Sequence, residues 1–111
     1  MGKQLNFTYK GQDYTLEFNK RIVKSMENSG FVVQDFDKRT MNTMEDLFKG
    51  AFRMHHKKLK DDYIEEILAH FSDKEALWSR LMEMYAEPQA ELFDEPDEDD
   101  ENLIKWETTD N

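Results

Sequence analysis

A chain of 111 residues is long enough for one small domain, and it contains no cysteine, so disulfides and thiolate metal sites are excluded. The formal net charge of -10 is concentrated at one end, because residues 91–111 carry ten acidic residues and one basic residue, Lys105. The nearly neutral remainder argues against nucleic-acid binding. No signal segment opens the chain, and no apolar run approaches the roughly 20 residues of a membrane span, so we expect a soluble intracellular protein without membrane contact.

The first predicted element is a β-hairpin over residues 5–18. Two short runs alternate apolar and polar residues, which places the apolar positions on one face. A glycine at the first central position suits a type II′ turn, so the turn is predicted at Gly11-Gln12. The opposed pairs would then be Tyr9 with Tyr14, Phe7 with Leu16, and Leu5 with Phe18. This apolar face needs a cover, because a lone hairpin is only marginally stable in water.

Four helices are predicted after the hairpin. Asn19 is a good N-cap for the first, and Gly30 is placed to end it. Asp62 and Ser72, each followed three residues later by glutamate, predict capping boxes for the last two. Pro88 is predicted to end the final helix. The predicted ranges are about 20–29, 41–59, 62–71 and 73–87, and residues 31–36 are expected to be a linker or a short strand.

The helix over residues 41–59 is predicted to be the packing centre of the domain. Its start is left open, with Asp37 and Thr40 as alternative caps. Gly50 would cost about 1 kcal/mol relative to alanine in an exposed helix, so we expect it to serve close packing. The apolar face recurs at steps of three and four and comprises Met41, Met44, Leu47, Phe48, Ala51, Phe52, His55 and Leu59.

These elements predict an α+β fold, with an N-terminal β-hairpin packed on a body of three to four helices. The single domain would span residues 1–93. Residues 94–111 are predicted to be a disordered acidic tail, because the segment repels itself and has little apolar area to bury.

No pattern in the chain supports catalysis, a cofactor or a metal site, and we predict a protein that is not an enzyme. His55 and His56 would point about 100° apart on a helix and cannot jointly chelate one metal. A metal site would need His70 and an acid such as Glu66 from another helix. We expect instead that His55 lies at the edge of the core and His56 in solvent.

Partner binding is the better supported hypothesis. Methionine is adaptable and common on promiscuous binding surfaces, and Met54 and Met84 lie off the main helical stripes, so we expect both to be exposed. In the tail, a few large apolar residues interrupt the acids, which is typical of a segment that becomes ordered when it binds a partner. The alternatives are a flexible end and a segment that folds back on its own body. The predicted partner-binding residues are Met44, Phe48, Phe52, Met54, Met84, Leu103, Ile104 and Trp106.

The segments of the chain are, in order, a small hairpin, a helix carrying LFKGAFRMHHKKL, a helix opening DDYIEEIL, a helix ALWSRLMEMY and an acidic end. In the order of these segments the chain resembles the tail assembly chaperones of long-tailed (siphovirus-type) bacteriophages and prophages. The resemblance covers residues 5–90. It is closest at Gly50-Ala51-Phe52, at His55-His56, from Asp62 to Leu68 and from Leu81 to Tyr85.

The resemblance implies a non-catalytic protein that binds and solubilises the helical, apolar tape measure protein and helps to recruit tail tube subunits. Such a protein acts in the host bacterial cytoplasm and is not expected in the mature virion. A homo-oligomer and a longer frameshifted product are left open. The alternative is an acidic phage-encoded inhibitor that binds a nucleic-acid-processing enzyme by mimicry, which would need carboxylates fixed on a folded face.

Overall fold

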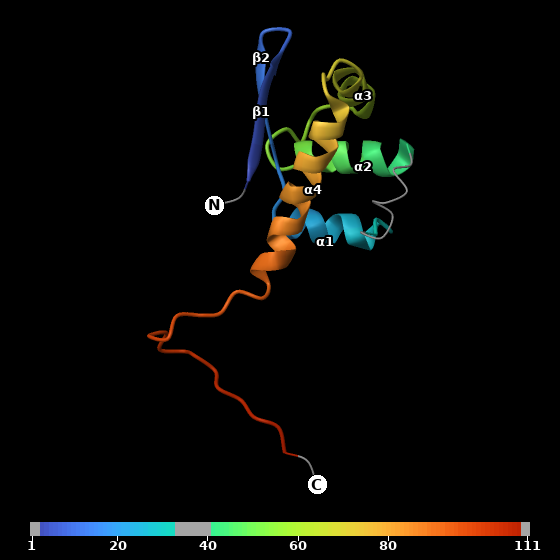
Figure 1. The fold of residues 1–111 in the computed structure, drawn as a ribbon. Coiled ribbons are helices and arrows are strands. Elements are labelled where there is room, and N and C mark those ends of the chain that lie inside the picture. Colours follow the sequence, from blue (N-terminus) through green and yellow to red (C-terminus); the bar gives the residue numbers. More distant parts are fainter. Residues whose placement is uncertain (1–2, 33–40, 110–111) are drawn as a thin grey trace.

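The computed structural model describes residues 3–32 and 41–109 and confirms the α+β prediction, with an N-terminal hairpin followed by a helical body (Figure 1). Helix α2 is central, since it contacts β2, α3 and α4, while α4 also contacts α1. The helix caps predicted at Asp37 and Thr40, and most of the predicted linker, lie outside the described residues. The elements are β1 (Gln4–Tyr9), β2 (Gln12–Glu17), α1 (Lys20–Asn28), α2 (Met41–Phe52), α3 (Asp61–Ala69) and α4 (Lys74–Glu91).

The predicted turn and register of the hairpin are wrong, although its apolar face is right. The turn is at Lys10-Gly11, whose φ values of 51° and 77° match a type I′ turn with two left-handed residues. Phe7 therefore pairs with Tyr14 rather than Leu16. The shift moves each partner by two residues, and side chains alternate with a period of two, so the same side chains still face the helices.

The ends of α1 agree with prediction. The Asn19 side-chain oxygen accepts a hydrogen bond from Ile22 N–H at 2.8 Å, which satisfies a free donor of the first turn. After the helix, Gly30 adopts a φ of 96°, and Phe31 N–H donates to the Met26 carbonyl at 3.0 Å. This Schellman-type arrangement requires a left-handed residue at the Gly30 position.

Helix α2 supplies the centre of the core, as predicted. Gly50 allows the close approach of α1, because a Cβ at this position would lie 2.5 Å from Met26 Sδ. The expectation that Gly50 serves packing is confirmed. Four side chains of α2 are at most 1% exposed: Leu47, Phe48, Ala51 and Phe52.

Helix α2 ends at Phe52, seven residues before the predicted end. The chain turns there, and both following histidines reach β2. His55 Nε2 lies 2.8 Å from Glu17 Oε1, and His56 Nε2 accepts a hydrogen bond from Thr15 N–H at 3.0 Å. These tertiary hydrogen bonds replace the next helical turn, so residues 53–59 do not extend the helix.

Neither predicted capping box forms. Helix α3 begins at Asp61, with Lys60 in the cap position, so Asp62 lies inside the first turn, where its charge favours the helix dipole. At the start of α4, Asp73 replaces Ser72 as the cap. Its carboxylate accepts a hydrogen bond from Ala76 N–H at 3.2 Å.

The prediction that Pro88 ends the last helix is also wrong, since α4 continues to Glu91. Pro88 is buried and lines the same hollow as Val23 of α1, and the helix continues past it although proline cannot donate a backbone hydrogen bond. Beyond α4, residues 94–109 form a largely exposed, irregular chain that leads away from the body (Figure 1). Disorder of this tail stays a prediction. Among the described helices, none has the length and apolar character needed to cross a membrane.

Candidate functional site

Three predicted partner-binding residues lie in the core. Phe48 and Phe52 are 1% and 0% exposed, so they offer no surface to a partner in this conformation. Met84 is 1% exposed, and the expectation that it is exposed is wrong. Helix α4 crosses both α1 and α2, which widens its buried face beyond the predicted stripe. Met44 and Met54 are half-buried.

The apolar residues of the tail are largely in solvent. Ile104 and Trp106 are 81% and 80% exposed, and Leu103 is partly buried. Their role in partner binding stays a prediction. The acidic residues from 94 to 101 lie on irregular chain rather than on a helix or strand, so they form no fixed array of carboxylates of the kind that nucleic-acid mimicry needs.

An apolar groove of about 320 Å³ lies between α1 and the end of α4, and sequence analysis missed it. Val23 and Pro88 are buried beside it, whereas Leu92 and Phe93 are 69% and 82% exposed at its edge. The apolar positions Leu92 and Phe93 after Pro88 were a usable signal, but no local pattern shows that they lie beside α1. We call this the α1/α4 groove. Its lining comprises Lys20, Val23, Lys24, Glu27, Pro88, Gln89, Leu92 and Phe93.

The rim of the α1/α4 groove is mainly basic on the α1 side. Lys20 and Lys24 both line it, and in residues 3–32 and 41–109 neither has an ion-pair partner. Glu27 is the acidic residue of the rim, and Gln89 donates a hydrogen bond to its carboxylate at 3.4 Å. The groove therefore combines an apolar floor with an edge that favours anionic groups.

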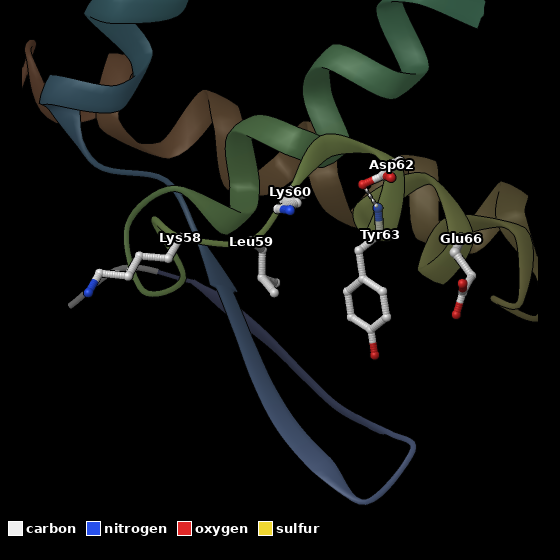
Figure 2. A pocket seen from close by; sticks show the side chains of 6 residues that line it. All are labelled: Lys58, Leu59, Lys60, Asp62, Tyr63 and Glu66. Atoms are coloured by element: carbon white, nitrogen blue, oxygen red, sulfur yellow. Dashed lines mark hydrogen bonds between the residues drawn. The ribbon is translucent and has the colours of Figure 1, made fainter.

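Figure 2 shows a second depression, of about 470 Å³, beside the start of α3. The labelled side chains are spread apart along its edge, and they do not converge on a point where a ligand could be held. Glu66 instead ties α3 to the hairpin, because Tyr9 Oη donates to its carboxylate at 2.7 Å and Lys10 Nζ at 3.1 Å. These hydrogen bonds lower the pKa of Glu66. The arrangement is structural. The residues drawn are Lys58, Leu59, Lys60, Asp62, Tyr63 and Glu66.

The two adjacent histidines have the reverse of their expected environments. His56 is half-buried, with its ring 5.1 Å from that of Tyr14, whereas His55 is the more exposed. Burial and the nearby His55 lower the pKa of His56, which agrees with a neutral ring that accepts the hydrogen bond from Thr15. His70 lies elsewhere, at the end of α3.

Glu17 is the buried carboxylate of this region, at 8% exposure. Burial raises the pKa of Glu17, but the hydrogen bonds from His55 and from Gln4, the latter at 2.9 Å, lower it by more. The pKa is therefore below its usual value. Within the described part of the chain, no group of three or more histidine, aspartate or glutamate side chains is placed to hold a metal ion. Glu17 acts as a buried link between β2, β1 and the chain after α2.

Comparison with known proteins identifies a family. The family model described as Domain of unknown function (DUF5055) matches residues 1–109, which include the hairpin, the helical body and nearly all of the acidic tail. No curated protein and no solved structure matches the chain.

Proposed function

The chain belongs to the DUF5055 family, and we propose that it is a non-catalytic tail assembly chaperone of a long-tailed bacteriophage or prophage. In this role it binds and solubilises the tape measure protein and helps to recruit tail tube subunits. It acts in the host bacterial cytoplasm and is absent from the mature virion. The family description names no activity, so the proposal depends on the sequence resemblance over residues 5–90 and on the surface of the protein.

The observation that carries the proposal is the pair of exposed apolar side chains next to the α1/α4 groove. Leu92 and Phe93 are 69% and 82% exposed and continue the apolar floor formed by Val23 and Pro88. Contiguous exposed apolar surface in a small protein is typical of an interaction site. An amphipathic client helix can place its apolar face in such a groove, anchored by residues three and four positions apart.

The acidic tail suits the same role. Residues 91–111 carry ten acids and one base, and they begin at the edge of the groove. A client held there is brought next to a strongly negative segment. Like charges on neighbouring complexes repel one another, which opposes their aggregation.

The test is co-expression of the N-terminally tagged protein with the tape measure protein encoded by the same replicon. We expect the tape measure protein to remain in the supernatant and to co-purify with the tagged chain. The double variant Leu92→Ser/Phe93→Ser should reduce the recovered amount, because it removes the apolar edge of the groove and alters only exposed side chains.

The matched control is Met41→Ser, which also removes an exposed apolar side chain, 78% exposed, but at the start of α2. It should leave recovery unchanged. A tape measure protein that stays insoluble with the wild-type chain, or equal recovery with the double variant and the wild type, would overturn the proposal. Both variants should be checked for an unchanged far-UV circular dichroism spectrum.

A further inference from the structure

We propose that the α1/α4 groove binds residues 103–106 of the same chain, so that the tail folds back and covers the groove in cis. The docking needs no client, and a client helix that binds the same groove would have to displace the tail. The occupant is identified by three features of the described residues: the reach of the tail, the spacing of its apolar side chains, and the charges on the two sides.

The tail is long enough to reach back to the groove. Phe93 lies at the edge of the groove, and Leu103 follows ten positions later. Extended chain spans about 3.3–3.6 Å per residue, so ten residues can leave the groove and return to it. Two successive turns over residues 97–103 bend the tail within the acidic run, directly before Ile104. In these turns Asp100 N–H donates to the Asp97 carbonyl at 3.0 Å, and Leu103 N–H donates to the Asp100 carbonyl at 3.1 Å.

The apolar side chains of the tail are spaced to enter the groove together. Ile104 and Trp106 are two positions apart, so in extended chain they point to one side and Lys105 to the other. Both are about four-fifths exposed when the tail is extended, and they are among the largest apolar side chains in solvent. A volume of about 320 Å³ suits two side chains of a peptide, since pockets for whole small molecules run from about 300 to 1,000 Å³.

The charges on the two sides are complementary. The acids from 97 to 101 lie directly before the apolar cluster, so a returning tail carries them past the rim of α1. Lys20 and Lys24 lie on that rim, and Arg21 is exposed on the same helix. Glu27 opposes this attraction, but it is one carboxylate against the two lysines of the lining. Because exposed charges are screened by salt, docking should weaken as ionic strength rises.

The experiment uses the absence of cysteine. A nitroxide spin label on the variant Lys105→Cys is attached at a single position of the full-length, ¹⁵N-labelled chain. We expect loss of the amide NMR signals of Val23 and Lys24 on α1, which is restored on reduction of the nitroxide. The amides of Leu92 and Phe93 are not informative, since the tail begins there. High salt should reduce the loss.

The matched control carries Ile104→Ser and Trp106→Ser in the same labelled background, and it keeps tail length and charge. We expect the amide signals of α1 to recover in this variant, and to recover in part in Lys20→Glu/Lys24→Glu, which alters exposed side chains alone. An equal signal loss in the labelled chain and in the serine variant would mean a randomly moving tail and would overturn the proposal.

A second sample mixes a ¹⁵N chain without the label and a labelled chain without ¹⁵N. We expect no signal loss in this mixture. A loss here would show that the tail docks on another copy, which would overturn docking in cis. Since no client is present in either sample, neither result depends on whether the protein is a tail assembly chaperone.

Discussion

Replacement of Gly50 by alanine tests whether close packing, rather than backbone freedom, accounts for the glycine in α2. In an exposed helix this change stabilises by about 1 kcal/mol. Here the new Cβ would lie 2.5 Å from Met26 Sδ, 2.9 Å from Met26 Cε and 3.3 Å from Phe18 Cε1. Met26 is 3% exposed, so its sulfur and methyl group must shift within the core, and overpacking a core costs about 1–3 kcal/mol. We therefore expect Gly50→Ala to lower the free energy of unfolding by about 1 kcal/mol.

A double-mutant cycle with Met26→Ala separates the two contributions. Met26→Ala alone should cost about 2–5 kcal/mol, because it leaves a cavity. In that background Gly50→Ala meets no sulfur atom, so it should stabilise by about 1 kcal/mol, and the coupling should be about 2 kcal/mol. Urea unfolding followed by far-UV circular dichroism measures each free energy, with an unchanged m-value as the control. Stabilisation by Gly50→Ala in the wild-type chain, or an additive cycle, would refute the reasoning.

Three further predictions concern polar contacts that join the hairpin to the helical body or α2 to α3. The pKa of His56 is lowered below its usual 6.5, so just below pH 6.5 the unfolded chain binds a proton at this ring and the folded chain does not. The free energy of unfolding should therefore rise with pH up to about 6.5 and then level off. Urea unfolding across this range should show a flatter profile in His56→Gln. Lys10→Asn should raise the melting temperature and the free energy of unfolding, the latter by about 0.5 kcal/mol, because asparagine suits the first position of a type I′ turn. The ion pair from Lys10 to Glu66 that the change removes is exposed and contributes little. Lys49→Met removes the cation that lies 3.3 Å from Glu65, 3.9 Å from Glu45 and 4.0 Å from Asp61. It should lower the free energy of unfolding by about 1 kcal/mol in low salt and by less in high salt, with Lys49→Arg as the control. A smaller loss of stability in low salt than in high salt would contradict this.

Local patterns predicted the centres of the buried faces but not their limits. Alternation in the hairpin and the three-and-four spacing around Phe48 placed Leu47, Phe48, Ala51 and Phe52 correctly in the core, because burial follows these periods. The same spacing wrongly included Met41, which is 78% exposed, and His55 in the apolar face. The hairpin register could not be found in this way. A shift of two residues leaves the face unchanged, and the choice of turn depended on Lys10 adopting a positive φ, which its side chain does not signal.

Features fixed by contacts distant in sequence were the ones missed. The end of α2 depends on hydrogen bonds from His55 and His56 to a strand about 40 residues earlier in the chain. Helix α4 continues past Pro88, which is buried, despite a strong local stop signal. The α1/α4 groove needs α1 and the end of α4 side by side, and no local pattern in the sequence shows that arrangement.

The hydrogen bond from Thr15 to His56 also bears on whether the hairpin can pair with the strands of other chains. Both strands of a two-stranded sheet are edge strands, and open edges invite pairing with other chains. Here the helical body occupies each edge: His56 accepts from Thr15 N–H on β2, and Arg80 donates to the Gln4 carbonyl on β1 at 2.8 Å. A protonated His56 can no longer accept that bond, and the edge of β2 is uncovered. Under acidic conditions the Thr15 N–H is thus free to pair with a strand of another chain, and edge-to-edge aggregation should begin at β2.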